Sequence, residues 1–363
     1  MKKVLFVAST EIHIRHFHMP YIERFKKLGW QVHVACKCNS ESIPEVDKLI
    51  NLPFEKKMTS LRNFKATALL HEQIKKNNYD LMLCHTSLAA FFSRLAVLGL
   101  RRRPAVCNMV HGYLFDDDSS MIKKLVMTAA EKITAPVTEL ILAMNKYDFD
   151  YAKKHKLAKQ VGYVNGIGLD ESKCEACEEN LRKKFGFSEN SYLVLYAAEF
   201  SKRKNQKLLI NALSKLPMQV CLILPGDGEF LGECKTLAEK LGLAERVCFP
   251  GYVKGVGKWY SAVDAAVSSS RSEGLPFNIL EAMYYGLPVV ASAVKGHTDL
   301  IEDGMSGLLA PFDDAEKFAE KINLLIENPE LAKNLACNAK AKSEEFLLET
   351  VKEKVMHLYL TIV

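Results

Sequence analysis

The chain alternates short apolar runs with segments that are apolar at helical spacing, and this alternation occurs twice. In the first half, the runs that predict buried strands are residues 4–8, 32–35, 81–85, 105–111 and 140–143. Between them, the helical spacing predicts helices over residues 20–28, 66–77 and 89–98. Strands alternating with helices indicate a parallel sheet covered by helices on both faces.

The second series begins after a short polar break, residues 165–170, which contains two glycines and is the expected hinge. Its predicted strands are residues 192–198, 220–225, 247–250, 265–268, 288–291 and 307–310. Its predicted helices are residues 205–214, 231–241, 278–285 and 315–326, and residues 331–359 are helical in pattern. The fold class is therefore α/β, with two doubly wound units in tandem and ligands at the carboxyl ends of their strands.

Composition limits the class of protein. A chain of 363 residues with 48% hydrophobic and 25% charged residues is typical of a globular protein with two domains. No apolar run approaches 18 residues, and the first one stops too early for a signal peptide. Ten scattered cysteines are consistent with reduced thiols and a cytoplasmic location.

The charge is unevenly distributed along the chain. Residues 1–170 carry 26 Lys and Arg against 16 Asp and Glu, whereas residues 171–363 carry 23 against 27. No nucleic-acid recognition motif accompanies the basic half, so an anionic membrane surface is the better partner for it. The strongest focus is Arg101, Arg102 and Arg103, after an apolar helical pattern, with Lys123 and Lys124 further along. Two interpretations stay open: a core-packed helix whose positive end suits the helix dipole, or a docking site for anionic lipid.

Dinucleotide and nucleoside triphosphate motifs are absent. The loop after the first strand contains no glycine, Gly226-Asp227-Gly228 lacks the third glycine of a dinucleotide fingerprint, and no P-loop is present. A nicotinamide-dependent enzyme is therefore disfavoured.

The most informative segment holds two glutamates with seven residues between them. Glu273 lies in a turn rich in Gly and Pro, and Glu281 lies inside the helix that this turn opens. A carboxylate and free backbone N–H groups facing one ligand suit a molecule with both hydroxyls and phosphates.

This segment resembles the Glu-x7-Glu signature of retaining glycosyltransferases of family 4, which have two Rossmann-like domains facing across a cleft (GT-B type). Further segments resemble that family in order, particularly its bacterial exopolysaccharide and capsule enzymes. They are residues 14–21 with 29–35, His111-Gly112, residues 165–170, 199–206, 251–252, 260–264, 286–291, 296–301 and 304–308. The resemblance implies an N-terminal acceptor-side domain, residues 1–166, and a nucleotide-sugar-binding domain, residues 167–344, with a final helix at about 345–363 that crosses back.

The resemblance also implies site residues. The expected catalytic residues are His111, Glu273 and Lys204. The expected donor-binding residues are Glu281, Arg203, Gly274, Phe277, Asn278 and Ile279, and the acceptor side would include His16, His18 and His85. Glu199 stands where many relatives carry an arginine that grips the diphosphate, and Arg203 is the expected substitute.

No metal or cofactor is expected. Asp116-Asp117-Asp118 has the spacing of a metal-binding motif, but it sits in a loop beyond a strand end and is expected to be solvated. The charge on a leaving diphosphate would then be stabilised by Lys204 and by the N–H groups of Asn278 and Ile279.

The sequence thus predicts a cytoplasmic, metal-independent, retaining hexosyl- or N-acetylhexosaminyltransferase for polysaccharide assembly. Its donor would be a nucleotide sugar, in particular a UDP-sugar, and its acceptor a glycan or a polyprenyl-diphosphate-linked sugar. It would lie free in the cytoplasm or peripherally on the inner face of the plasma membrane. The alternatives are a nucleotide-sugar epimerase of the same fold and a non-catalytic sugar or nucleic-acid binder.

Overall fold

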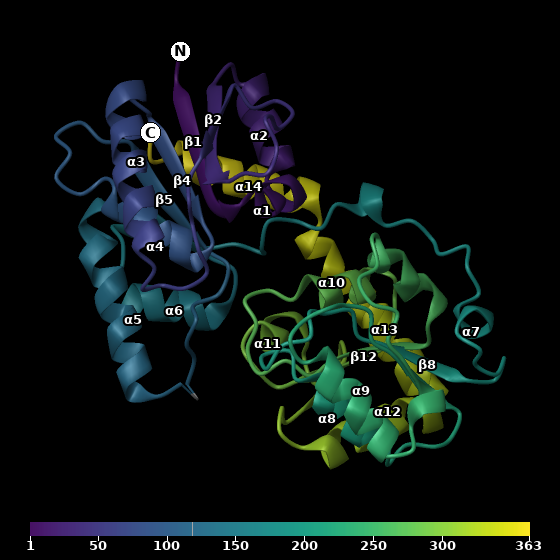
Figure 1. Cartoon of the computed structure of the whole chain (residues 1–363). Coiled ribbons are helices and arrows are strands. Elements are labelled where there is room, and N and C mark those ends of the chain that lie inside the picture. Colours follow the sequence, from purple (N-terminus) through teal and green to yellow (C-terminus); the bar gives the residue numbers. More distant parts are fainter. Residues whose placement is uncertain (118) are drawn as a thin grey trace. The chain divides into compact units, whose positions relative to one another are not determined.

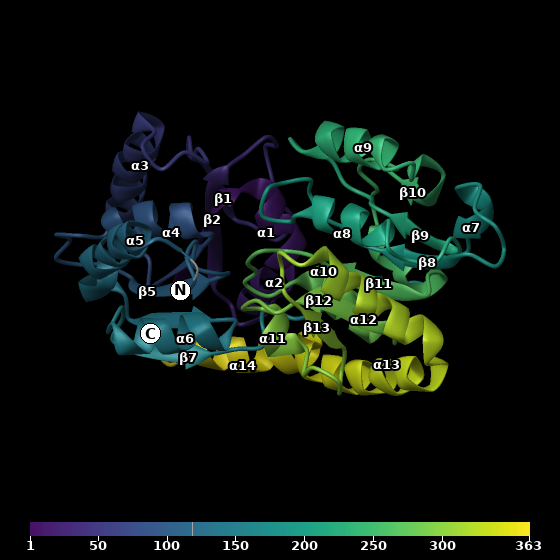
Figure 2. The same ribbon diagram turned by 90° about the horizontal axis from the view of Figure 1, so that it is seen from below.

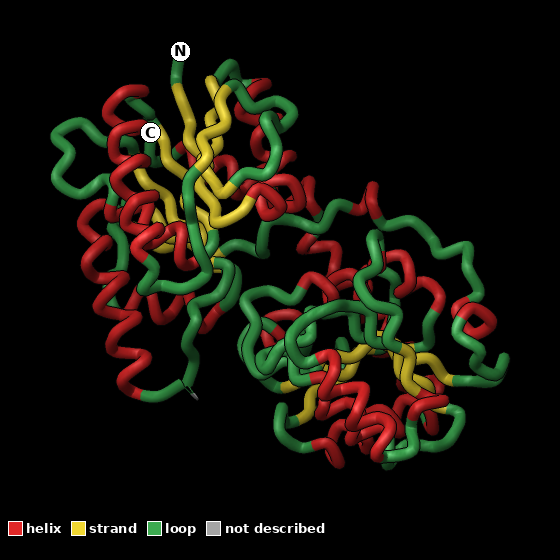
Figure 3. The backbone as a smooth tube through the Cα atoms, viewed as in Figure 1, coloured by secondary structure: helices red, strands yellow, loops and turns green. Residues whose placement is uncertain are grey.

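The computed structural model describes residues 1–117 and 119–363, and the chain divides into two compact units (Figure 1). Unit 1 comprises Met1–Gly168 and Glu349–Val363, and unit 2 comprises Leu169–Leu348. Each unit is a sheet with helices packed against it (Figure 3). The expectation of two Rossmann-like α/β units is confirmed by this architecture.

Unit 1 is built on a parallel sheet of seven described strands in the order β3-β2-β1-β4-β5-β6-β7. The strands are β1 (Lys3–Thr10), β2 (Gln31–Lys37), β3 (Lys48–Asn51), β4 (Leu81–His85), β5 (Ala105–Val110), β6 (Leu140–Ala143) and β7 (Gln160–Tyr163). The central strands are buried on both faces, because every residue of β4 and residues 4–8 of β1 are inaccessible to solvent. That burial explains why they read as continuous apolar runs.

The helices of unit 1 cover both faces of this sheet (Figure 2). They are α1 (Glu11–Phe17), α2 (Met19–Lys27), α3 (Leu61–Asn77), α4 (Ser87–Leu95), α5 (Met121–Thr134), α6 (Lys146–Lys154) and α14 (Leu348–Leu360), with a 3₁₀ turn at Ala135–Val137. Helix α4 contacts α3 and α5, and Thr128 of α5 is hydrogen-bonded to Tyr151 of α6, so these four helices share one face.

The final helix α14 packs on the opposite face, beside α2. The Tyr359 ring lies 6.3 Å from that of Tyr21 and 6.4 Å from that of Phe25, and its hydroxyl contacts Met109 of β5. The chain passes from one unit to the other near Leu169 and again near Leu348, and these two segments are hydrogen-bonded to each other. The N–H of Leu169 donates to Phe346 O, and the N–H of Leu348 donates to Leu169 O.

Unit 2 has a parallel sheet of six described strands in the order β10-β9-β8-β11-β12-β13. They are β8 (Tyr192–Leu195), β9 (Val220–Ile223), β10 (Val247–Cys248), β11 (Ala265–Ser268), β12 (Val289–Ser292) and β13 (Leu308–Ala310). The helices are α7 (Leu181–Lys184), α8 (Gln206–Leu213), α9 (Leu231–Lys240), α10 (Phe277–Tyr284), α11 (His297–Leu300), α12 (Ala315–Glu327) and α13 (Pro329–Ser343), with 3₁₀ turns at Glu171–Lys173, Ala244–Arg246, Val256–Ala262 and Glu344–Phe346. Helix α8 packs on α9 and α12, and α10 packs on α13.

Several elements differ from the sequence prediction. Helix α1 begins directly after β1, where a loop was expected, because the Thr10 hydroxyl caps it by accepting from His13 N–H. The short edge strands β3 and β7 are only partly buried, so their apolar pattern is weak. The helical pattern over 331–359 is two helices, α13 and α14, separated by residues 344–347.

Candidate active site

Three neighbouring parallel strands of unit 2 deliver the polar residues to one edge of the sheet. Strands β8, β11 and β12 are adjacent, and each ends before a loop that leads into a helix. Because parallel strands end at the same edge, the loops at residues 196–205, 269–276 and 293–296 converge there. This convergence places Lys204, Glu273 and His297 close together.

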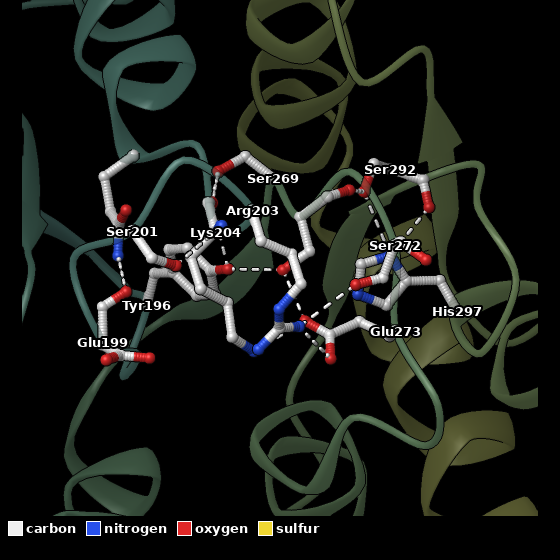
Figure 4. Close-up of polar contacts among 12 residues, drawn as sticks. Tyr196, Glu199, Ser201, Arg203, Lys204, Ser269, Ser272, Glu273, Ser292 and His297 are labelled. Atoms are coloured by element: carbon white, nitrogen blue, oxygen red, sulfur yellow. Dashed lines mark hydrogen bonds and ion pairs between the residues drawn. The ribbon is translucent and has the colours of Figure 1, made fainter. Parts of the chain in front are cut away.

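Glu273 is the centre of this cluster (Figure 4). Its Oε1 lies 2.6 Å from Lys204 Nζ, and its Oε2 lies 2.8 Å from Arg203 Nη1. The Ser270 hydroxyl donates to Oε1 over 2.5 Å, and Arg203 also donates to the carbonyl of Ser272. One buried carboxylate therefore pairs with both of the cations expected to hold a diphosphate, and the three groups together keep one positive charge.

The ionisation of this cluster follows from its burial. Burial alone would raise the pKa of Glu273, but the charges of Lys204 and Arg203 outweigh it and hold the pKa at about 2. Burial lowers the pKa of Lys204, and the attraction of Glu273 offsets only part of that effect. The cluster thus contains a stable carboxylate and an ammonium group that burial has made less favourable.

A framework of hydroxyl groups fixes the loop that carries Lys204. Tyr196 OH lies 2.8 Å from Ser270 Oγ and donates to the carbonyl of Lys204 over 3.2 Å. Ser269 Oγ lies 3.0 Å from the carbonyl oxygens of both Lys204 and Asn205. Asn205 adopts a left-handed conformation, φ +56°, and this bends the chain into α8.

Gly296 and His297 complete this edge, and neither is among the site residues that the sequence predicts. A Cβ on Gly296 would lie 2.9 Å from the Glu273 Cβ and 2.8 Å from the Gly274 carbonyl oxygen, so only glycine allows this approach. His297 is fully buried, its Nδ1 lies 2.8 Å from Ser292 O, and its Nε2 has no hydrogen-bond partner among the described residues. Burial lowers its pKa to about 4, so the ring is neutral at pH 7. The motif at residues 296–301 was the available signal.

Helix α10 carries the second glutamate. No hydrogen-bond or ion-pair partner of the Glu281 carboxylate occurs among the described residues, and a Cβ on Gly257 would lie 3.2 Å from its Oε1. Burial raises the pKa of Glu281 to about 7. This carboxyl group is thus largely desolvated, unpaired and next to a glycine. Burying a polar group without a hydrogen bond costs free energy, which a ligand with hydroxyl groups would recover by donating to it.

The remaining predicted donor residues lie in or next to the first turn of α10. Gly274 is in the loop that precedes the helix, and Phe277 is its first residue. The Asn278 Nδ2 is buried without a described partner. The Ile279 N–H, however, donates to the Pro276 carbonyl over 3.1 Å, so this amide is already engaged. Glu199 is exposed, and Arg203 rather than this position supplies the second cation beside Glu273.

Unit 1 gathers four histidines where β1, β4 and β5 end. The His18 and His85 rings lie 3.7 Å apart, the His13 and His111 rings lie 4.8 Å apart, and His111 Nε2 lies 3.4 Å from His85 Nδ1. Burial lowers the pKa of all four well below the usual value, to about 4 for His13. His18 and His85 therefore do join His111. His16 does not, because it is exposed and its Nδ1 contacts Ile12 O.

His13 is the member of this cluster that is not among the predicted site residues, because α1 was expected to be a loop. The Nε2 atoms of His13, His18 and His85 are buried without described partners. Within residues 1–117 and 119–363, His13, His18 and His111 are the group with metal-binding potential, since one nitrogen of each lies within 4.8 Å of the others.

The aspartate loop has other contacts. Asp116 Oδ1 accepts from the Ser119 hydroxyl, and Asp117 Oδ1 lies 3.2 Å from Tyr147 OH and 3.7 Å from Lys124 Nζ. Asp118, the third residue of the predicted Asp-x-Asp spacing, lies outside the described residues.

The arginine triplet does not end a helix, contrary to one of the two interpretations. Helix α4 stops at Leu95, six residues before Arg101, which is beyond the reach of its dipole. Arg101 and Arg102 are exposed, whereas Arg103 pairs with Glu139 over 2.9 Å and donates to the Val137 carbonyl.

Comparison with known proteins agrees with this description of the fold. A model described as glycosyl transferases group 1 matches residues 178–342, and a model described as glycosyl transferase 4-like matches residues 3–139. A putative glycosyltransferase EpsD of Bacillus subtilis (strain 168) is 31% identical over 367 residues, which span 99% of this chain and 96% of the relative. The chain is a glycosyltransferase of the GT-B fold and belongs to glycosyltransferase family 4.

Two further relatives extend the comparison. The Escherichia coli UDP-Gal:alpha-D-GlcNAc-diphosphoundecaprenol alpha-1,3-galactosyltransferase is 24% identical over 312 residues, which span 82% of this chain and 79% of the relative. The crystal structure of Anabaena Alr3699/HepE in complex with UDP and glucose has a TM-score of 0.82 at 22% identity and covers 99% of this chain and 100% of that one. At 22% identity, this structural similarity shows that the two proteins share a fold.

Proposed function

We propose that this protein is a retaining, metal-independent transferase that moves a hexose or an N-acetylhexosamine from UDP to a lipid-linked glycan. The main support is the pair of ion pairs that Arg203 and Lys204 form with Glu273. Glu273 lies in the loop just before helix α10, which contains the unpaired Glu281. Two cations and a helix N-terminus suit a diphosphate, and an unpaired carboxylate suits two ribose hydroxyls. The Anabaena structure contains UDP and glucose, which supports a UDP-sugar donor.

In the proposed reaction, the acceptor hydroxyl oxygen bonds to the anomeric carbon of the sugar while the bond from that carbon to the diphosphate oxygen breaks. The acceptor proton passes to the departing diphosphate, so atoms and charge balance. Attack from the face on which the diphosphate leaves gives retention. Lys204, Arg203 and the first turn of α10 stabilise the charge that develops on the leaving group, which is the role a metal ion has in other transferases.

His111 is proposed to contact the donor sugar, and Glu273 its hydroxyl groups. For Glu273, this role requires Lys204 or Arg203 to shift toward the diphosphate when the donor binds, because both now occupy its oxygens. His18 and His85 are proposed to line the acceptor side through their contacts with His111.

The proposed acceptor is a sugar on a polyprenyl diphosphate. The Escherichia coli relative is named for an acceptor on diphosphoundecaprenol, and the basic charge of residues 1–170 suits anionic headgroups. All ten cysteines are free thiols, which supports a cytoplasmic location with peripheral contact to the inner face of the membrane. Arg101 and Arg102 are exposed and available for that contact, unlike Arg103.

The test is a thermal-shift screen of nucleotide sugars, followed by product analysis. A donor at about 100 times its dissociation constant stabilises the fold by roughly 2.7 kcal/mol. UDP and one or more UDP-hexoses are expected to stabilise the protein more than GDP- or dTDP-sugars. The anomeric coupling in the NMR spectrum of the product reports retention. Stabilisation by GDP-sugars alone, or an inverted product, would contradict the proposal.

A further inference from the structure

Helix α5 in unit 1 is turned with its apolar side outward. Met121, Ile122, Leu125, Val126 and Ile133 have exposed fractions of 79%, 77%, 72%, 58% and 55%. At about 100° per residue, all five lie within roughly 140° of one helix face. A helix of a globular protein normally buries that face.

The inward side of α5 is mostly polar, although Met127 packs against a core cluster. Thr128, Glu131 and Thr134 are the buried residues of this helix. The Glu131 carboxylate accepts hydrogen bonds from Arg94 Nη1 over 2.9 Å and from Arg94 Nη2 over 2.8 Å. Arg94 is a residue of α4 and has no exposed surface. A buried guanidinium requires such a partner, so removing Glu131 from the interior would leave an uncompensated charge. The Arg94–Glu131 pair thus fixes the rotation of α5 and keeps its apolar face outside.

Basic side chains flank this face. Lys123 is exposed on α5 about 60° beyond one edge of this face, and Lys132 is exposed near its other edge, about 20° inside it. Arg103 contacts the chain just after the helix, so the exposed Arg101 and Arg102 lie near its end. Lys124 is engaged with Asp117. A 14-residue helix is about 20 Å long, and an apolar stripe of that length edged by lysine and arginine fits a helix lying flat in a bilayer interface.

We propose that the outward face of α5 is inserted into the interface of an anionic phospholipid bilayer. The inference rests on the proposed function in one respect, because a lipid-linked acceptor explains why the enzyme would need this contact. Within residues 1–117 and 119–363, no helix has the length and apolarity to cross a bilayer, so α5 is proposed to lie on the membrane surface. The arginines add electrostatic attraction, whereas the apolar side chains provide the insertion.

The experiment compares two matched double variants of the full chain. Ile122→Gln/Leu125→Gln makes the proposed membrane face polar. Met218→Gln/Met305→Gln removes two apolar side chains of unit 2, with exposed fractions of 78% and 54%, and is the control. Because the altered side chains in both are largely exposed, unchanged melting temperatures are expected.

Each protein is sedimented with vesicles of phosphatidylglycerol and phosphatidylcholine, or of phosphatidylcholine alone. The parent and the control are expected to bind the anionic vesicles, and the α5 variant to partition about a hundredfold less, since each buried large apolar side chain changes the equilibrium by about tenfold or more. Raising the salt should weaken the binding of the parent without abolishing it, because salt screens the charges but not the apolar insertion.

Two results would overturn the proposal. One is equal partitioning of the α5 variant and the parent. The other is self-association of the parent without lipid that the α5 variant loses while vesicle binding stays the same, which would assign the face to a second copy of the chain. Transfer to a short soluble acceptor is measured in parallel and should be equal in all three proteins. A failure of the proposed function would appear as absent transfer in every protein, independently of vesicle binding.

Discussion

Lys204 Nζ lies 2.6 Å from Glu273 Oε1, although 69 positions separate the two residues in the chain. The pair forms because β8 and β11 are adjacent parallel strands whose following loops meet at one edge of the sheet. It also couples two roles. The lysine proposed to bind the diphosphate is held in place by the carboxylate proposed to meet the sugar, so donor binding must rearrange this contact.

Lys204→Met is expected to reduce transfer by about 10²–10³-fold, the usual loss when a group that stabilises developing negative charge is removed. Initial rates at saturating donor measure this change. Lys207→Met is the control. Lys207 lies three residues after Lys204 and forms an exposed ion pair with Glu233, which contributes little to stability.

A loss of folding could mimic that result, since Lys204→Met leaves Glu273 with one partner fewer. Lys204→Met/Glu273→Gln removes both charges and is expected to recover stability but not transfer. Full transfer by the single variant would show that Lys204 has no part in the reaction.

Glu281→Ala is expected to weaken the binding of UDP itself, because the proposed ribose contact belongs to the nucleotide. Losing hydrogen bonds to a charged group should cost about 1.5–3 kcal/mol, which is roughly 10- to 100-fold in affinity. Isothermal titration calorimetry with UDP measures it, and Glu245→Ala, an exposed site in the same unit, is the control. Equal affinity for the variant and the parent would refute the ribose assignment.

Glu281 also predicts a pH dependence of stability without ligand. Burial raises its pKa from 4.5 to about 7, so the folded state holds this proton more tightly than the unfolded state. The resulting stabilisation is complete below pH 4.5 and is lost as the pH rises through 7, a change of about 3 kcal/mol. Urea unfolding at pH 5 and pH 8 should show a smaller difference for Glu281→Gln than for the parent. If the unfolding free energy of the parent and of Glu281→Gln depended on pH to the same extent, a group other than Glu281 would cause the pH dependence.

Transfer is expected to survive excess EDTA, because the proposed charge stabilisation comes from Lys204, Arg203 and α10. A loss that magnesium or manganese restores would point to the Asp116–Asp117 loop. A loss that zinc restores would point to His13, His18 and His111. Metal analysis of the purified protein accompanies the assay.

Gly296→Ala is expected to destabilise unit 2 and to impair transfer, since the added Cβ would lie 2.9 Å from Glu273 Cβ in a backbone with φ +84°. The strain and the clash together should cost about 2–5 kcal/mol. Gly304→Ala is the matched control, because Gly304 has a similar φ of +75° but open space at its Cβ. If both variants lose the same stability in urea, the close approach to Glu273 contributes nothing.

The sequence alone determined the two α/β units and pointed to the residues of the proposed donor site. Alternating apolar runs report buried parallel strands directly, and the order of motifs located Lys204, Glu273 and Glu281, because these depend on short stretches of chain. The sequence did not reveal that Arg203 and Lys204 both pair with Glu273, because such contacts depend on strand order.

Only the tertiary structure decided which way the ambiguous elements face. Helix α5 contains apolar residues that any periodicity argument would bury, yet Arg94 in the neighbouring helix requires Glu131 inside, and the apolar side turns outward. His13 joins the histidine cluster because Thr10 caps a helix directly after β1. In each case a contact between distant or capping side chains overrides the local pattern, since burying an unpaired charge or leaving N–H groups unsatisfied costs more than exposing apolar surface.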